Sequence, residues 1–215
     1  MQCNKRLKHG SLIGLSMMLA SCNLFTGKPT VNPDPNHIHA DFAVWIDGKQ
    51  LDFSGEEFMS EELTPEQEEQ SKHETGSLDA QALRKYLHLH DGNGHVIHIH
   101  KPGLMLLDFF GTLKIGFSEK CYSSGIPGAD GEECSEHPFR LFVNGVERPM
   151  DDIFLSYVFA DEDKILITTA VDDTELQKEL KLLTDDACLY SQTCPERGEP
   201  PTENCIADPA VPCVE

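Results

Sequence analysis

The sequence predicts an α+β domain, with a mainly antiparallel sheet of hairpins and one packed core helix. Three observations support this class. Alternating polar and apolar residues flank dipeptides typical of hairpin turns, one apolar run repeats at helical spacing, and a further apolar strand follows. The chain has 215 residues, and about 150 of them lie between a polar N-terminal stretch and a cysteine-rich end, enough for one sizeable core.

The first predicted hairpin lies in the segment HIHADFAVWIDGKQLDF. Apolar residues alternate there with His37, His39 and Asp41, so the two sets point to opposite faces of a strand. Asp47-Gly48 is a strong signal for a two-residue hairpin turn. We therefore expect two antiparallel strands around this dipeptide.

The second hairpin, KYLHLHDGNGHVIHIHKPG, has two possible registers. A three-residue loop, Gly92 to Gly94, with Gly94 in the left-handed conformation, pairs His88 with His98, whereas a two-residue Asn93-Gly94 turn puts the histidine pairs on opposite faces. The first register collects the leucines and isoleucines on one apolar face, so burial favours it. It places four histidines together on one face and His95 on the other: His88, His90, His98 and His100.

The remaining elements complete the fold prediction. The run LMLLDFFGTL has helical spacing and predicts the buried core helix. FRLFVNGVERPM repeats the hairpin pattern around Asn144-Gly145, DKILITTA predicts a strand, and residues 172–183 predict a final helix with Leu176, Leu180 and Leu183 on one face. Because a helix stands between hairpins in this order, we expect a β-grasp-like arrangement.

The N-terminus has the features of an export signal. A basic patch around Lys5 precedes an apolar run that is too short to span a bilayer as a helix. Leu19-Ala20-Ser21-Cys22 resembles the lipobox of bacterial lipoproteins. The resemblance implies cleavage before Cys22, acylation of its thiol with fatty acids such as palmitate, and, with Asn23 next, an anchor in the outer membrane, facing the periplasm or the surface. The chain then divides into a signal peptide (1–21), a lipidated cysteine and tether (22–36), a histidine-rich domain (37–183) with an acidic insertion (54–77), and a disulfide-rich tail (184–215).

Charge excludes several classes of partner. The chain carries 17 basic and 37 acidic residues, and three of the basic ones lie before Cys22. The exported part therefore has a formal charge of −23 with neutral histidines. Nucleic acid and anionic lipid headgroups are poor partners for such a surface, whereas cations in general are attracted to it. We expect a metal ion and, through the lipid anchor, the membrane as partners; no protein partner can be named.

Six cysteines remain in the exported part besides Cys22, and an even number outside the cytoplasm predicts three disulfides. Cys121 and Cys134 bracket a Gly/Pro-rich loop far from the others, so we expect them to pair. The pairing of the remaining four stays open: Cys188, Cys194, Cys205 and Cys213. No C-x-x-C motif is present, which argues against a cysteine metal cluster and a thioredoxin-like enzyme.

The histidines are the main functional signal. Seven of ten occupy two short segments, as three H-x-H pairs and His95. Each pair puts two imidazoles on one side of a strand, roughly 6.5–7 Å apart at Cα. If the first strand lies beside the second hairpin, six imidazoles and a carboxylate border one site, and the predicted metal ligands are His37, His39, Asp41, His88, His90, His98 and His100. A polar strand face explains one exposed H-x-H pair, but it explains three poorly.

Neutral imidazole and carboxylate ligands suit divalent zinc, copper, nickel and iron, of which we favour zinc or copper. Six imidazoles exceed the four ligands of one site, which suggests either two ions or three to four ligands with the others in support. Because the rings bind only when deprotonated, affinity should fall as the pH drops through about 6.5.

Four segments together, HIHADFAVWIDG, LHLHDGNGHVIHIHKPG, LLDFF and LFVNG, resemble a group of exported bacterial and archaeal proteins with H-x-H hairpins and a following D-F-F helix. The resemblance covers about half of the chain. It implies one coherent domain and no particular reaction.

Three functions fit these observations. The first is a non-catalytic lipoprotein that buffers or delivers a divalent metal at the cell envelope. The second is a metal-dependent hydrolase or oxygen-using enzyme with Asp41 or Asp91 as general base. The third is an adhesion or scaffold module in which the histidines are incidental. The chain lacks the H-E-x-x-H, Walker, G-x-S-x-G and dinucleotide-binding motifs, which favours the first.

Overall fold

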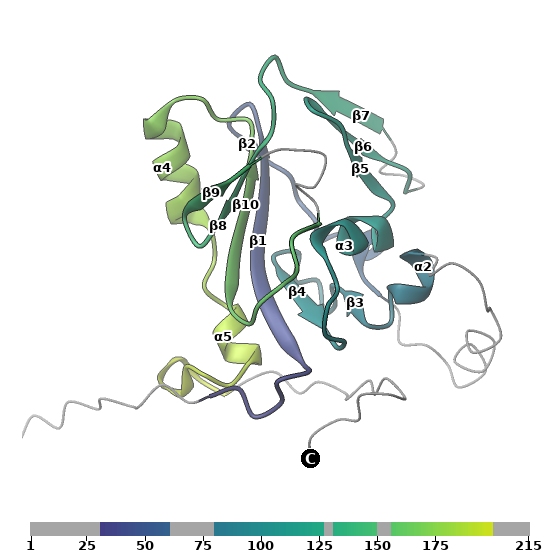
Figure 1. Ribbon diagram of the computed structural model, residues 1–215, viewed down its shortest axis with the longest axis vertical. Coiled ribbons are helices and arrows are strands. Elements are labelled where there is room, and N and C mark those ends of the chain that lie inside the picture. Colours follow the sequence, from purple (N-terminus) through teal and green to yellow (C-terminus); the bar gives the residue numbers. More distant parts are fainter. Residues whose placement is uncertain (1–30, 61–79, 127–130, 150–155, 200–215) are drawn as a thin grey trace, which may run out of the picture.

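A central mixed sheet dominates the computed structural model, which describes residues 31–60, 80–126, 131–149 and 156–199 (Figure 1). The strand order is β3-β4-β1-β10-β8-β9, and β2 also pairs with β1. All neighbouring pairs are antiparallel except β1 and β10, which are parallel. The strands are β1 (Ile38–Ile46), β2 (Lys49–Gln50), β3 (Leu87–His88), β4 (Val96–Ile99), β8 (Arg140–Val143), β9 (Val146–Arg148) and β10 (Asp163–Thr168).

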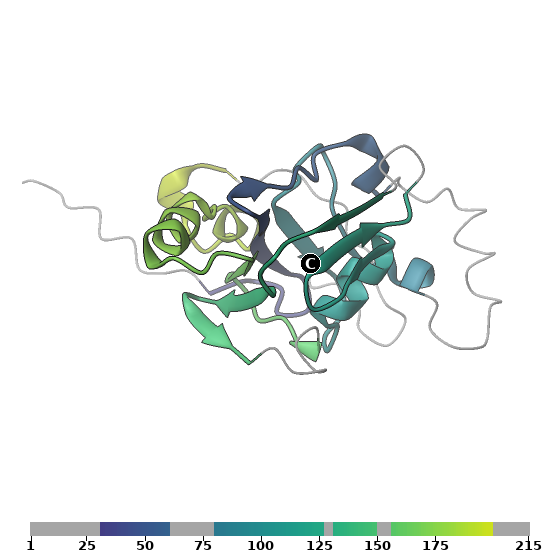
Figure 2. The same ribbon diagram turned by 90° about the horizontal axis from the view of Figure 1, so that it is seen from above.

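A three-stranded antiparallel sheet and several short helices complete the described part of the chain. The helix α3 and this small sheet lie on one side of the central sheet, and α4 lies on the other (Figures 1 and 2). The mixed α+β class is therefore confirmed. The elements are β5 (Ile115–Phe117), β6 (Cys121–Ser124), β7 (Gly131–Cys134), α2 (Ala80–Leu83), α3 (Leu106–Thr112), α4 (Asp173–Leu182), α5 (Ala187–Tyr190), and the 3-10 turns η1 (Glu56–Phe58) and η3 (Pro195–Arg197).

Strand β1 is buried on both faces because it lies at the centre of the sheet. Its residues Phe42 and Val44 enter the main core, where Phe109 and Phe110 of α3 pack against them. Trp45 points the other way, into a second cluster beneath α4. The predicted core helix is thus confirmed, and its spacing places both phenylalanines on the sheet side.

Both predicted turn dipeptides form hairpins. Asp47 and Gly48 have φ of 48° and 75°, and Asn144 and Gly145 have φ of 53° and 75°. Two consecutive left-handed residues match the twist of antiparallel strands, which is why these dipeptides are favoured. The first turn returns the chain from β1 to β2, and the second joins β8 to β9.

The predicted final helix is confirmed as α4. Asp172 caps it, accepting hydrogen bonds from the backbone N–H groups of Thr174 and Glu175 at 2.7 and 3.2 Å. The bonds from these two N–H groups lower the pKa of the Asp172 carboxyl, with the largest effect from Glu175. The expected leucine stripe packs into the second cluster, which fixes the helix on the sheet. No helix in the described ranges is both long and apolar enough to cross a bilayer.

Two disulfides are present among the described cysteines. Cys121 pairs with Cys134 across β6 and β7, as predicted. Cys188 pairs with Cys194, which resolves part of the open connectivity. Cys205 and Cys213 lie outside the described residues, as do the predicted signal peptide, Cys22 and most of the acidic insertion.

The C-terminal segment differs from the separate tail that the sequence suggests. Residues 184–199, called the cover below, pack against the sheet, and α5 contacts β1 (Figure 1). Ala187, Cys188 and Ser191 are buried there. The cover lies over the face of β1 that carries His39.

Candidate metal site

Strand pairing brings the three H-x-H pairs together. His39 of β1 lies opposite His98 of β4, and His98 lies opposite His88 of β3. Directly opposed residues of antiparallel strands project from the same face. The expected adjacency of the first strand and the second hairpin is therefore confirmed. The histidine cluster consists of His37, His39, His88, His90, His98 and His100.

The rings of the cluster touch one another across the strands. On the β1 side, the ring centroids of His37 and His100 are 4.0 Å apart, and those of His37 and His39 are 4.5 Å apart. His39 and His98 meet edge to face at 4.9 Å. On the β3 side, the ring centroids of His90 and His98 are 3.9 Å apart. The ring centroid of His88 lies 5.7 Å from that of His90 and 5.9 Å from that of His98. The cluster is one continuous group of imidazoles.

The register of the hairpin is as predicted, but its turn is not. Asp91 and Gly92 have φ of 58° and 68° and form the turn, closed by the N–H of Asn93 donating to the carbonyl of His90 at 3.0 Å. The Asn93 side chain then accepts hydrogen bonds from the N–H groups of His95 and Val96, at 3.0 and 3.1 Å. The loop formed in this way is compatible with the register that pairs His88 with His98.

Gly94 has a packing role in place of the expected left-handed one. A Cβ at Gly94 would lie 2.4 Å from the carbonyl carbon of Phe53. Only glycine permits this approach of two backbones. His95 is not in its expected position on the opposite face, because its Nε2 lies 3.1 Å from Oδ2 of Asp186 in the cover.

Most of the cluster is buried. His39 and His98 are 1% and 0% exposed, and His88 and His100 are at most 5% exposed. Tyr190 of the cover closes the site, with its ring centroid 4.8 Å from that of His98 and 5.4 Å from that of His39. A solvated polar strand face would leave such rings in water. Burial of this many polar rings requires bonded partners for their nitrogens.

Three histidines lie close enough together that they could hold a metal ion. His37, His39 and His98 each offer one ring nitrogen, and these atoms lie within 4.8 Å of one another. In a tetrahedral site with bonds of about 2.0–2.1 Å, ligand nitrogens lie roughly 3.4 Å apart. Binding one ion in that geometry would bring the three nitrogens closer together. We call these three residues the histidine trio.

A hydrogen-bonded relay determines which nitrogen His39 offers. Its Nδ1 lies 2.9 Å from Oγ of Ser191, and Ser191 donates its hydroxyl hydrogen to Oδ1 of Asp161 at 2.5 Å. Because that hydrogen is used, Oγ accepts from Nδ1–H of His39. Nε2 of a neutral His39 then carries the lone pair that a metal ion needs.

A second relay acts on His98. Oδ2 of Asp91 lies 2.9 Å from Nδ1 of His90, whose Nε2 lies 3.1 Å from Nδ1 of His98. A carboxylate accepts, so Nδ1 of His90 donates to it, and Nε2 of His90 accepts from His98. The lone pair of neutral His98 is thereby placed on Nε2. His39 and His98 are thus each linked to a carboxylate through one intervening side chain. Carboxylates linked to histidines in this way are common at metal sites.

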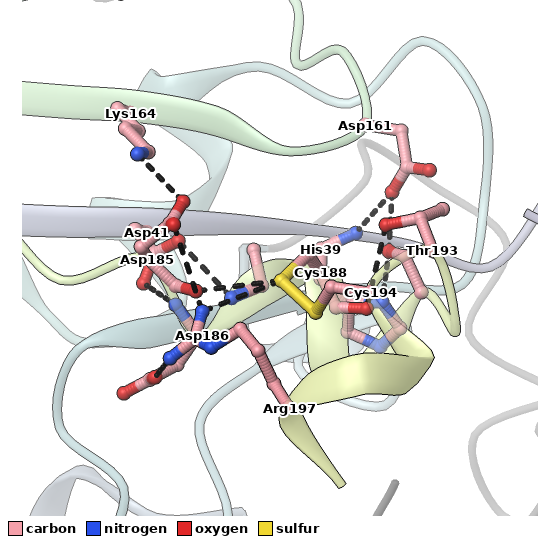
Figure 3. The surroundings of a disulfide bond; sticks show 12 residues. His39, Asp41, Asp161, Lys164, Asp185, Asp186, Cys188, Thr193, Cys194 and Arg197 are labelled. Carbon is pink, nitrogen blue, oxygen red and sulfur yellow. Dashed lines mark hydrogen bonds and ion pairs between the residues drawn. A yellow bond between two sulfur atoms is a disulfide. The ribbon is translucent and has the colours of Figure 1, made fainter. Parts of the chain in front are cut away.

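Asp41, also a predicted ligand, is hydrogen-bonded to the cover. Its Oδ1 accepts hydrogen bonds from the Thr184 hydroxyl and the N–H of Asp186, and its Oδ2 accepts from the N–H of Ala187 at 3.0 Å. It therefore holds the start of α5, and the trio does not include it. Figure 3 shows Asp41 and Asp186 on one side of the Cys188–Cys194 disulfide and Asp161 on the other.

Sequence reasoning missed Asp161, Ser191 and Tyr190. Ser191 is 152 positions from His39, in a segment without apolar periodicity. Asp161 precedes β10, and only the parallel pairing of β10 with β1 brings it to His39, whose backbone N–H donates to it at 3.1 Å. No local sequence pattern marks that pairing.

A second group of possible ligands lies at Cys121, Glu132 and Cys134. Its two cysteines form a disulfide, so their sulfurs are not thiolate ligands. The histidine trio is therefore the stronger candidate for a metal site in the described part of the chain.

No protein family, curated protein or solved structure matches the chain. The function of the histidine cluster must therefore follow from its own geometry and chemistry.

Proposed function

We propose that this protein binds a divalent transition metal ion through the histidine trio and holds or delivers that ion without transforming it. The observation that carries the proposal is the convergence of three ring nitrogens, within 4.8 Å, from adjoining parts of one sheet face. Neutral imidazole nitrogen suits zinc and copper(II) best among the common metals, with nickel and iron(II) next. His88, His90 and His100 support the trio.

Burial favours a metal over an incidental polar face. His39 and His98 are almost fully buried, and moving a polar ring out of water costs free energy unless its nitrogens are satisfied. The two relays use Nδ1 of these rings and leave Nε2 with a lone pair. Both lone pairs are of the kind that a bound cation accepts.

The surroundings of the trio favour retention over catalysis. A cavity of about 470 Å³ lies nearby, but Asn32, Asp161 and Thr193 are among its lining residues and the trio is not. The carboxylates first considered as general bases are engaged, Asp41 with the cover and Asp91 with His90. Binding or delivery needs neither a substrate pocket nor a free base.

We also propose that the protein acts at the cell envelope as a lipoprotein anchored at Cys22. The basic, apolar and small-residue pattern before that cysteine supports this. The two disulfides fit an oxidising compartment. A β-grasp-like arrangement is part of the same proposal, supported by the helix α3 between two hairpins and the parallel pair of β1 and β10.

Metal analysis of the exported protein tests this function. The full chain is expressed with its own leader, extracted with detergent, and offered zinc, copper, nickel and iron(II) separately. We expect one tightly bound ion per chain, lost in His98→Ala and retained in His137→Ala, whose histidine is exposed and does not belong to the trio. Absence of any bound ion in the unmodified protein would contradict the proposal. Fatty acid released from the purified protein tests the anchor separately.

A further inference from the structure

The cover contains a short loop that is closed by the Cys188–Cys194 disulfide (Figure 3). This loop presents Ser191 to the cluster. We propose that Ser191, backed by Asp161, is a positioning residue for the metal: it determines that His39 binds the ion through Nε2. The inference rests on the proposed metal-binding function. It extends the site to the cover, which has no predicted metal ligand.

The direction of each hydrogen bond supports this role. Asp161 accepts on both oxygens: Oδ1 from Ser191 and from the N–H of His39, and Oδ2 from Nδ2 of Asn32 at 2.9 Å. A serine hydroxyl has one hydrogen, which goes to Asp161. Ser191 can then only accept from His39, so the ring carries its hydrogen on Nδ1. The other tautomer would set a lone pair of His39 against a lone pair of Ser191.

The position of Ser191 is held from both ends of the loop. Its N–H donates to the carbonyl of Ala187 at 3.0 Å, and the N–H of Ala187 donates to the buried carboxylate of Asp41. On the other side, the disulfide ties the loop back to α5, and Arg197 pairs with Asp186 at 2.7 Å. Ser191 itself is 1% exposed. Its hydroxyl is therefore held in place before an ion arrives.

The same loop offers a matched control. Thr193 also carries a hydroxyl, but it donates to the carbonyl of Cys188 at 3.4 Å. Replacing Thr193 with alanine removes a hydroxyl of the cover without touching the relay. A difference between Ser191→Ala and Thr193→Ala therefore reports on the relay and not on the cover in general.

The experiment measures the His39 tautomer and zinc affinity in the exported full-length protein. Nitrogen-15 NMR of labelled histidine should show Nδ1–H at His39 in the metal-free protein and loss of that preference in Ser191→Ala. Zinc affinity, from competition with a chromogenic chelator, should fall about 10- to 100-fold in Ser191→Ala and less than about twofold in Thr193→Ala. The absorption spectrum of bound cobalt(II) should shift only in the first variant.

Asp161→Asn serves as the second variant, because it keeps the shape of the side chain and removes its charge. It should weaken zinc binding in the same direction. Hydrogen on Nε2 of His39 in the unmodified protein, or equal zinc affinities in Ser191→Ala and Thr193→Ala, would overturn this inference and leave the metal site standing. Failure of the unmodified protein to bind zinc, copper, nickel or iron(II) would instead overturn the proposed function and this inference with it.

Discussion

His98 lies directly opposite His39 in the β1–β4 pair, with the two rings edge to face at 4.9 Å. The strands come from segments about sixty positions apart, yet their pairing puts two metal-ligand candidates in contact. His98 is also the end of the relay that begins at Asp91. His98 therefore contacts both the β1 side and the β3 side of the histidine cluster.

Removing the charge of Asp91 should weaken metal binding without harming the fold. Asp91 is exposed, and its backbone has a left-handed conformation, which asparagine tolerates. Asp91→Asn should lower zinc affinity about tenfold, because His90 loses its anionic partner. Glu162→Asn is the control, since Glu162 is also exposed, acidic and left-handed. Equal zinc affinities of the two variants by chelator competition would refute the relay.

Opening the Cys188–Cys194 disulfide should loosen the site. By loop entropy alone, closing so short a loop is worth about 2 kcal/mol, and the loop carries Ser191 and Tyr190 onto the cluster. The double variant Cys188→Ser/Cys194→Ser should bind zinc at least about fivefold more weakly. Cys121→Ser/Cys134→Ser, which opens the other disulfide, should keep its zinc affinity while losing thermal stability. A loss of zinc affinity of the same size in both would mean that unfolding, and not the cover, is responsible.

Asp41 should stabilise the metal-free protein. It is 1% exposed and accepts hydrogen bonds from two backbone N–H groups and a hydroxyl of the cover. Asp41→Ala should lower the free energy of unfolding of the metal-free protein by about 2–4 kcal/mol, measured by urea denaturation. A metal ligand behaves differently: its loss weakens binding and leaves the metal-free protein nearly unchanged. That second outcome would restore Asp41 to the ligand set.

Glu179 should make stability depend on pH. Burial raises the pKa of its carboxyl, and the hydrogen bond from Thr168 only partly opposes this effect. The folded state therefore binds the proton of the Glu179 carboxyl more tightly than the unfolded state does. The protonated carboxyl stabilises the fold at low pH, and this stabilisation is lost as the pH rises from about 4.5 through the raised pKa of the folded state. Relative to the unmodified protein, Glu179→Gln should gain stability over that range, whereas Glu175→Gln should not. Parallel stability curves for Glu179→Gln and the unmodified protein would contradict the assignment.

Alternation was the informative signal in this sequence. The apolar residues that alternate with the histidines, such as Leu87 and Ile99, predicted the register of the second hairpin because they had to share one buried face. Leu87 and Ile99 are paired in the structure. The turn itself was not predictable, since Asp91-Gly92 and Asn93-Gly94 both favour left-handed conformations. The choice depends on Gly94 fitting against Phe53, a contact from outside the hairpin.

The contacts that the cover makes with the first strand could not be predicted from the local sequence either. Asp41 shares a face with His39, so its position in the strand suggested a ligand. Whether such a carboxylate binds a metal or a helix start depends on what packs above it, here residues 184–187. Ser191 and Asp161 reach His39 only through the folded arrangement, and nothing in their local sequence marks them.

X-ray absorption spectroscopy of the zinc-loaded protein identifies the atoms that bind the ion. We expect about three nitrogen ligands at roughly 2.0–2.1 Å with the outer scattering pattern of imidazole rings, and loss of that pattern in His98→Ala. A spectrum of oxygen ligands without imidazole scattering would contradict a metal site at His37, His39 and His98.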